Sequence, residues 1–235
     1  MPFGTLYLFP VPIAETPLNR VLPEFNSNLI CSLKYFIAED TKNARRFLKQ
    51  NQYPEISEAV ISELNEHSKS IEFAELLQPL LNGNNVGLMS DAGCPGIADP
   101  GAEIVRLAHQ KNIKVVPLVG PSSIVLSIMA SGFNGQNFSF TGYLPIEKPQ
   151  KIKRIKELEQ LALKQKQAQF FIETPYRNEQ MFDDLLTILQ PSTKVFVGIN
   201  LSALDEKLIC KTTSEWKQMK KPEMKKIPVV FGIFI

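Results

Sequence analysis

A loop rich in glycine and proline, running from Ser90 to Gly101, is the most unusual chemical feature of the sequence. It holds three glycines and two prolines within twelve residues. That composition indicates a fixed backbone that can approach a ligand closely. Free N–H groups in such a loop could bind a carboxylate or a ribose, and Asp91 could accept a hydrogen bond from an amine or a hydroxyl group. The alternative is a tight turn whose aspartate caps the next helix.

Two further loops have a composition suited to ligand contact. Gly120-Pro121-Ser122-Ser123 lies between an apolar strand and an apolar helix, and its hydroxyls could contact a ligand or merely cap the helix. The third loop spans residues 10–17 and contains three prolines. In parallel α/β sheets, ligands bind beyond the carboxyl ends of the strands, where loops enter helices. The three loops are therefore the candidate binding elements.

The elements that must position these loops alternate between short apolar runs and amphipathic segments. The predicted strands of the first half are 5–9, 35–38, 86–90 and 113–119. The predicted helices are 42–50 after a Thr41 cap, 71–81, 100–111 after an Asp99 cap with Pro100 at its first position, and 122–131. This alternation predicts a parallel sheet that is covered on both faces.

The character of the chain changes near residues 140–150. A Lys-rich helix is predicted over 148–166, with Ile152, Ile155, Leu158 and Leu161 on one stripe. A helix over 178–189 and strands over 169–172, 194–199, 207–210 and 229–235 follow. The expected organisation is an N-terminal α/β domain over 1–140 and a C-terminal α/β domain over 141–235.

The net charge of +2 is unevenly distributed. Residues 1–143 carry 10 basic and 13 acidic side chains, whereas residues 144–235 carry 16 basic and 11 acidic ones. The basic half could face an anionic partner or could be an ordinary solvated surface. If the partner is RNA, the first turns of the Lys-rich helix are expected to contact phosphates through Lys151, Lys153, Arg154 and Lys156.

Several function classes are excluded by what the sequence lacks. It has no apolar run of eighteen residues and no signal-peptide pattern, so a membrane location is not expected. Cys31, Cys94 and Cys210 fit neither a disulfide framework nor a zinc spacing, and His67 and His109 are isolated. The dinucleotide pattern G-x-G-x-x-G and the P-loop pattern are absent. A cytoplasmic protein without a metal site is expected.

Five segments, in chain order, match motifs of one family. Residues 38–42 read A-E-D-T-K, and the loop from Ser90 to Gly101 matches S-D-A-G-x-P-x-I-x-D-P-G. Shorter matches are V-P-L-V-G-P-S at 116–122, F-S-F-T-G-Y-L-P at 138–145 and E-T-P-Y-R at 173–177. Together they resemble the ribosomal RNA small-subunit methyltransferase I family over most of the chain. The glycine loop is highly specific, whereas the other matches would be weak alone.

The resemblance implies an α/β protein with the two-domain tetrapyrrole-methylase fold, in which the N-terminal sheet is mostly parallel and the C-terminal sheet is mixed. It also implies a homodimer that binds S-adenosylmethionine, without a metal, in a cleft between the domains. The residues that it places at the cofactor are Asp91, Gly93, Ile97, Ala98, Ser122 and Ser123. Glu39, Asp40, Glu173 and Arg177 would face the cleft, and Glu39, Glu173 and Arg177 are the expected catalytic residues.

The chain departs from the family pattern at three places. The family's T-P-I-G-N reads Val11-Pro12-Ile13-Ala14-Glu15, its H-E-H-N reads Asn65-Glu66-His67-Ser68, and its A-R-E-L-T-K reads Gly198-Ile199-Asn200-Leu201-Ser202-Ala203. The cofactor loops are retained better than the presumed substrate loops. This pattern indicates a divergent branch of the family.

The expected reaction is methylation of a ribose 2′-hydroxyl in ribosomal RNA. Methyl transfer requires an aligned acceptor and exclusion of water, and a hydroxyl acceptor also benefits from a nearby base. Glu39, Asp91 and Glu173 are the candidate bases; alternatively Glu39 is a surface residue, Asp91 only a cofactor ligand and Glu173 a partner of Arg177. Two other functions remain open: methylation of a small molecule such as a tetrapyrrole-like ring, and RNA or cofactor binding without catalysis.

Overall fold

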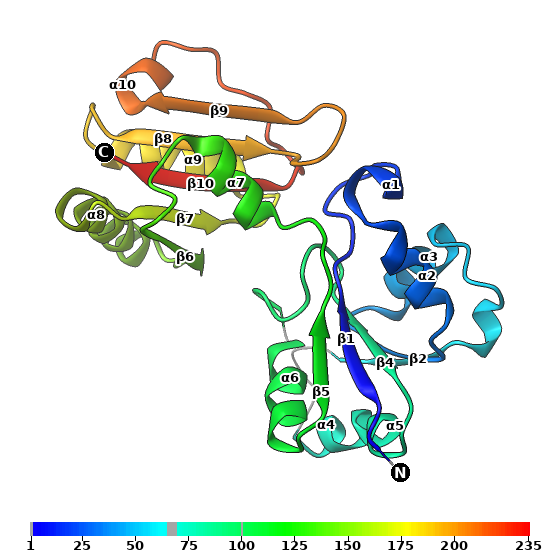
Figure 1. Ribbon diagram of the computed structural model, residues 1–235. Helices are drawn as coiled ribbons and strands as arrows, with labels where there is room; N and C mark the ends of the chain where they lie inside the picture. The colour runs from blue at the N-terminus through cyan, green and yellow to red at the C-terminus, as the bar shows by residue number, and fades with distance from the viewer. Residues whose placement is uncertain (1, 65–69, 100) are drawn as a thin grey trace. The chain divides into compact units, whose positions relative to one another are not determined.

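The computed structural model describes residues 2–64, 70–99 and 101–235. The chain divides into two compact units, Met1–Ser122 and Ser123–Ile235, and each unit is built around one five-stranded sheet (Figure 1). The division falls earlier in the chain than the expected boundary at residue 140. The reason is that the helix starting at Ser123 packs against strands of the second sheet.

The first unit contains a wholly parallel sheet, as predicted. Its strands are β1 (Thr5–Phe9), β2 (Tyr35–Ala38), β3 (Val60–Glu63), β4 (Val86–Met89) and β5 (Lys114–Pro117), in the order β3-β2-β4-β1-β5. Its helices are α1 (Leu18–Val21), α2 (Glu24–Cys31), α3 (Thr41–Gln50), α4 (Ser70–Leu76), α5 (Gln78–Leu81) and α6 (Gly101–Gln110), with a 3₁₀ turn, η1, at Ile56–Glu58.

Alternating side chains of the first sheet fill two hydrophobic clusters. In β2, Phe36 packs on one face with Phe47 of α3, whereas the next residue, Ile37, packs on the other face with Ile104 of α6. Figure 1 shows α2 and α3 on one face of this sheet and α6 on the other. Because both faces are covered, the strands are nearly continuous apolar runs. This packing holds the carboxyl ends of the strands, and the loops that follow them, in a fixed frame.

The structure differs from the sequence-based expectation at several elements of this unit. The helix predicted over 71–81 is divided into α4 and α5, since Pro79 provides no N–H for a continuous helix. Asp40, not Thr41, caps α3: its carboxylate accepts a hydrogen bond from the Asn43 N–H at 2.7 Å. The short elements α1, α2 and β3 were not expected from the apolar pattern. The predictions for residues 65–68, including His67, and for Pro100 concern residues outside the described part of the chain.

The second unit contains the predicted mixed sheet. Its strands are β6 (Phe138–Tyr143), β7 (Ala168–Ile172), β8 (Lys194–Ile199), β9 (Lys207–Thr212) and β10 (Val229–Phe234), in the order β6-β7-β10-β8-β9. Only β6 and β7 pair in parallel; the other neighbours are antiparallel. Its helices are α7 (Ser123–Ser131), α8 (Lys148–Gln165), α9 (Asn178–Ile188) and α10 (Thr213–Trp216).

Aromatic side chains dominate the core of the second unit. Phe171 and Phe231 stack with ring centroids 5.8 Å apart, and Phe182 meets Trp216 edge-on at 5.1 Å. The indole N–H of Trp216 donates to the Val195 carbonyl at 2.9 Å, which satisfies its polar group within the core. On the opposite face of this sheet, Phe133, which follows α7 in the chain, packs against Phe234 of β10. Among the described residues, no helix has the length and apolar character required to span a membrane.

Candidate functional site

The loop from Ser90 to Gly101 leaves the carboxyl end of β4 and turns sharply three times. Gly93, Gly96 and Ala98 have positive φ angles of 79°, 81° and 62°. Ala98 is unusual because a residue with a Cβ atom is disfavoured in this region. The carboxylate of Asp99 locks the loop, since one oxygen accepts hydrogen bonds from the N–H groups of Gly96 at 2.7 Å and Gly101 at 2.9 Å. The capping role predicted for Asp99 is therefore confirmed.

A pair of backbone hydrogen bonds joins this loop to the loop after β1. Val11 donates to the Gly93 carbonyl at 2.9 Å, and Gly93 donates to the Val11 carbonyl at 2.9 Å. A Cβ atom on Gly93 would lie 3.4 Å from the Ile13 side chain. That distance is an ordinary van der Waals contact, so the positive φ of 79° is what favours glycine at this position.

The loop after β5 meets the loop after β1 even more closely. A Cβ atom on Gly120 would lie only 2.4 Å from Cβ of Pro10 and 3.1 Å from the side chain of Leu22. The thiol of Cys94 also lies 3.5 Å from the Pro121 carbonyl. Because β1 lies between β4 and β5, the sheet brings all three candidate loops to one edge.

A cavity of about 310 Å³ opens beside the two loops that Val11 and Gly93 join. The loop after β1 forms one wall through residues 11–16, and residues 89–92 form another. The third wall is α3, which contributes Asn43, Arg46 and Gln50. A cavity of this volume, with polar groups on its walls, can hold part of a small ligand.

Asp91 lies on the wall of this cavity, and its surroundings raise the pKa of its carboxyl group. Burial raises the pKa of the Asp91 carboxyl above the ordinary value of 3.8, and the nearby negative charge of Asp40 raises it further. A hydrogen bond with the Asn43 side chain and the positive charge of Arg46 act in the opposite direction. Asn43 and Arg46 were missed by sequence reasoning, although their positions on one side of α3 are a signal that could have identified them.

Glu39 does not line that cavity. It is half-buried and borders a much smaller one, of about 10 Å³, together with Ser90 and Asp99. That volume is about enough for a single water molecule. Glu39 therefore borders the inner side of the glycine loop, whereas Asp91 borders the larger cavity.

The other residues predicted to bind the cofactor occupy the glycine loop and the end of the first unit. Ile97 is 52% exposed, and Ala98 beside it is also exposed. Ser122 is the last residue of the first unit, and Ser123 begins α7 in the second. Ile97 and Ala98 thus present apolar surface at the same sheet edge as Asp91.

In the second unit, Glu173 and Arg177 form an ion pair with 2.6 Å between the closest nitrogen and oxygen atoms. The same Glu173 oxygen accepts a hydrogen bond from the Thr174 N–H at 2.6 Å. Glu173 is buried, whereas the Arg177 side chain remains 40% exposed. The hydrogen bond to Glu173 raises the pKa of Arg177. This geometry favours the alternative in which Glu173 is a partner that orients Arg177.

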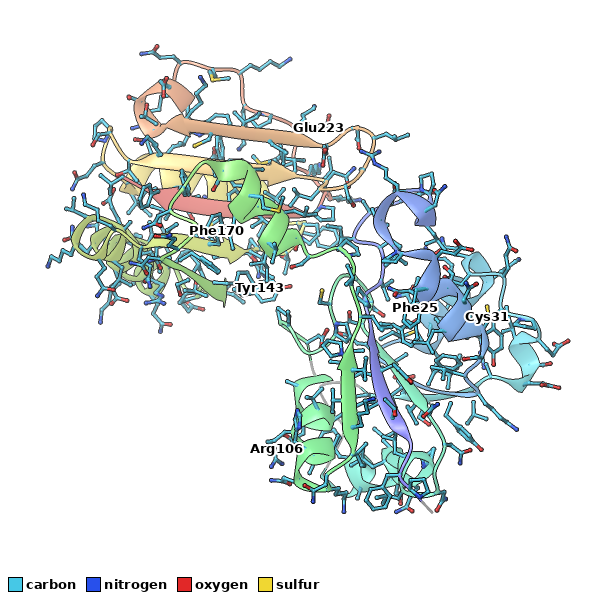
Figure 2. All side chains as sticks on the ribbon, in the orientation of Figure 1. Phe25, Cys31, Arg106, Tyr143, Phe170 and Glu223 are labelled. Carbon is cyan, nitrogen blue, oxygen red and sulfur yellow. The ribbon has the colours of Figure 1, made fainter. Side chains whose placement is uncertain are left out.

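Arg177 also borders an open cavity of about 450 Å³ at the ends of β6 and β7. The other walls are formed by Thr174 and by residues 143–146, among which Tyr143 is 57% exposed and Ile146 is 66% exposed. Tyr143 is labelled in Figure 2 at the end of β6. Sequence reasoning did not select Tyr143 or Ile146 as site residues. An exposed aromatic ring beside a guanidinium suits a planar ligand.

The basic face predicted for α8 is only partly available to a partner. Lys151 forms an ion pair with Asp184 at 2.5 Å, and its side chain is only 12% exposed. Arg154 pairs with Glu157 on the same helix. The ion pair with Asp184 of α9 and the low exposure argue against the predicted RNA contact of Lys151.

No group of three or more possible metal ligands occurs among the described residues, and His109 lies exposed on α6. The three cysteines are unpaired. The polar groups described at the two cavities are carboxylates, backbone and side-chain amides, hydroxyls and arginines.

Comparison with known proteins gives these loops a family context. The chain is 34% identical over 189 residues to ribosomal RNA small subunit methyltransferase I of Halalkalibacterium halodurans, which covers 79% of this chain and 61% of that protein. For the Vibrio cholerae protein of the same name, the identity is 29%, covering 84% and 65%. For that of Bacillus subtilis, it is 32% over 212 residues, covering 90% and 68%.

The chain belongs to the ribosomal RNA small subunit methyltransferase I family. It spans less than two thirds of the first two of these family members, at 61% and 65% of their lengths. No protein-family model matches the chain. The crystal structure of the methyltransferase CobJ has the same fold: the TM-score is 0.64 at 13% identity, covering 100% of this chain and 94% of CobJ. The expected tetrapyrrole-methylase fold is confirmed.

The close approach of the loops in this family member predicts a stability effect for Gly120→Ala. The added Cβ atom would overlap Pro10, and relief of the overlap is expected to cost about 1–3 kcal/mol of unfolding free energy. Gly135→Ala is the control, because a Cβ atom there has nothing within 4 Å. Urea unfolding of both variants should show a clear loss only for Gly120→Ala; equal stability would mean that the two loops do not pack as described.

Proposed function

We propose that this family member uses S-adenosylmethionine to methylate a ribose 2′-hydroxyl of ribosomal RNA. The single observation that carries the proposal is the locked glycine loop at the carboxyl edge of the first sheet, with Asp91 beside a cavity. Ligands of parallel sheets bind at this edge. The relatives are named as methyltransferases of small-subunit ribosomal RNA, which supplies the reaction and the acceptor.

The residues of the loop fit the chemical groups of the cofactor. Exposed apolar side chains at Ile97 and Ala98 suit its non-polar parts, and the Asp91 carboxylate can accept from an amine or a ribose hydroxyl. We assign Gly93 to close approach of backbone and ligand, and the hydroxyls of Ser122 and Ser123 to further polar contacts. When bound, S-adenosylmethionine supplies an activated methyl group.

The residues proposed for catalysis divide into two kinds. Glu39 and Asp91 are carboxylates at the edge of the first sheet, and either could accept the proton of the acceptor hydroxyl. The buried Glu173 orients the guanidinium group of Arg177, and a guanidinium held in this way can bind a phosphate of the acceptor RNA. We therefore assign Glu173 to positioning and Arg177 to substrate binding.

A methyl-transfer assay tests the reaction. Radiolabelled S-adenosylmethionine is incubated with the protein and, side by side, RNA from small ribosomal subunits and a small-molecule cell extract. Label is expected in the RNA, at nucleosides whose 3′ bond resists alkaline cleavage, as ribose methylation predicts. Label in the small-molecule extract alone would support the tetrapyrrole-like alternative. Cofactor binding without any transfer would support a relative that binds but does not catalyse.

Replacement of Gly93 is expected to abolish cofactor binding while the protein stays folded. In Gly93→Val, the side chain would enter the contact with Ile13 and must adopt a positive φ, at a strain of about 1–3 kcal/mol. Gly83→Val is the matched control, because Gly83 has a φ of 85° but lies before β4, at the opposite end of that strand. Calorimetry should detect binding by the Gly83 variant only; unchanged affinity in a folded Gly93 variant would refute the assigned site.

The raised pKa of Asp91 predicts how cofactor affinity depends on pH. Only the ionised carboxylate accepts hydrogen bonds with both oxygens, so affinity should fall as the pH decreases through the pKa of Asp91. Because burial places that pKa above 3.8, the loss should begin at a higher pH than for an ordinary aspartate. In Asp91→Asn, the affinity should be low throughout and this acid-limb dependence should disappear.

The melting temperature of Asp91→Asn serves as a control for that experiment, because it shows whether a change in affinity comes from loss of folding. A carboxyl whose pKa is raised by folding binds its proton more tightly in the folded state, so its contribution to stability is lost as the pH rises through the raised pKa. At neutral pH, Asp91→Asn is therefore not expected to lower the melting temperature. An unchanged pH profile for cofactor binding in this folded variant would contradict a role for Asp91.

We further propose that the protein is a homodimer in the cytosol. The supporting observation is an apolar surface on α7, where Val125 is 53% exposed and Met129, one turn later, is 75% exposed. The apolar end of the chain does not support it, because β10 is buried within the second sheet.

Light scattering with the variant Met129→Lys tests this dimer. At micromolar concentration the unaltered protein should have twice the mass of the 26.5 kDa chain, and the variant should shift towards 26.5 kDa. Leu163→Lys is the control, because Leu163 is also exposed, at 40%, but lies on α8. A mass of 26.5 kDa for the unaltered protein would contradict the proposal.

A further inference from the structure

All the basic residues of α3 lie on one face of the helix. Its ten residues include Lys42, Arg45, Arg46 and Lys49 and no acidic residue. Their spacing of three, four and seven residues places them in one stripe along a helix with 3.6 residues per turn. All four side chains are exposed. We call these four residues the α3 basic stripe.

Packing on the opposite side of the helix fixes the direction of the stripe. Ala44, Phe47 and Leu48 are buried and join the cluster that covers one face of the first sheet. Because these three residues lie diametrically opposite the cations, α3 cannot rotate without exposing its apolar face. The stripe is therefore a preorganised row of positive charges.

The charges of the stripe are arranged differently from those of other helices. Arg106 on α6 and Arg154 on α8 each pair with a glutamate three residues away, and Lys151 pairs with Asp184. Within residues 2–64, 70–99 and 101–235, no salt bridge involves the stripe. Like charges three and four residues apart destabilise a helix. The arrangement therefore does not serve the stability of α3, and it favours an external anion.

The stripe extends beside the cavity that contains Asp91. Arg46 lines this cavity together with Asn43 and Gln50, and its charge acts on the Asp91 carboxyl. From Lys42 to Lys49 the helix rises by about 10 Å. That length equals the axial rise of about three nucleotides of one strand of a DNA duplex. A polyanion bound to the stripe would thus pass directly beside the proposed cofactor site.

We propose that the α3 basic stripe binds consecutive phosphates of the acceptor RNA and leads the strand to the methyl-transfer site. This inference rests on the proposed function for the identity of the polyanion. A row of exposed cations without an exposed large hydrophobic side chain on α3 suits RNA better than a protein partner, because protein interfaces usually include apolar anchors. The proposal assigns the main phosphate-binding role to α3 rather than to α8, because Lys151 and Arg154 of α8 are already paired.

A triple substitution on each helix tests the assignment. The α3 variant carries Lys42→Gln, Arg45→Gln and Lys49→Gln; Arg46 is retained because it lines the cavity. The α8 variant carries Lys153→Gln, Lys156→Gln and Lys164→Gln, which removes the same charge from exposed positions. Binding of RNA from small ribosomal subunits is measured over a range of salt concentrations, and cofactor binding and melting temperature are measured in parallel.

The α3 variant should bind RNA about tenfold more weakly or worse, and its slope of log affinity against log salt should fall by about 2–3. Its cofactor affinity should be unchanged, and its melting temperature should be unchanged or higher, because like-charge repulsion is removed. The α8 variant should retain most of the affinity and slope.

Two results would overturn the assignment while leaving the proposed function intact. One is an α3 variant that binds and methylates RNA as the unaltered protein does. The other is an equal loss in both triple variants, which would indicate a response to net charge alone. If the unaltered protein binds cofactor but neither binds nor methylates the RNA, the proposed function and the role of the stripe both fail.

Discussion

The reciprocal backbone hydrogen bonds between Val11 and Gly93 connect the parts of the first unit on which the candidate site depends. They join the loop after β1 to the loop after β4, and the cavity with Asp91 opens beside this junction. Val11 and Gly93 lie outside the regular strands, so these two hydrogen bonds satisfy backbone groups that no neighbouring strand pairs with. The Asp99 carboxylate fixes the end of the glycine loop in the same way, because it accepts hydrogen bonds from the N–H groups of Gly96 and Gly101.

The site combines a rigid backbone with charges that do not favour stability. Ala98 adopts a positive φ, Asp91 has a raised pKa through burial, and α3 carries like charges on one face. Each of these features has a free-energy cost that well-packed sheet clusters on either side can offset. Their concentration at one edge of the sheet is typical of a functional surface rather than of a structural one.

The second unit supplies charge of a different kind. Its lysines and arginines are partly engaged in pairs, such as Lys151 with Asp184 and Lys221 with Asp183. Arg177 is also paired, but its partner Glu173 is buried. The guanidinium is therefore held by Glu173 while the Arg177 side chain remains partly exposed. The buried carboxylate is compensated by this pair and by the Thr174 N–H, so the arrangement orients Arg177 without leaving an unpaired charge.

Local patterns in the sequence were sufficient to predict most of the architecture. Apolar runs predicted β1, β2, β4 and β5, and the alternation with amphipathic segments predicted their parallel pairing. The glycine loop was recognised from composition, because φ angles such as those of Gly93 and Gly96 require residues that the sequence itself displays. Partly exposed or very short elements such as β3 and α1 were missed, since they bury little apolar surface.

The sequence by itself thus determined the fold class, the loop chemistry and the family. Only the tertiary structure decided which charges are available, because an ion pair such as Lys151 with Asp184 joins residues on two helices that no local pattern connects. The position of Arg46 beside Asp91 likewise depends on the strand order β2-β4-β1, which brings α3 and the glycine loop to one edge. Short-range periodicity fixes the face on which a side chain lies, whereas long-range packing fixes what that face meets.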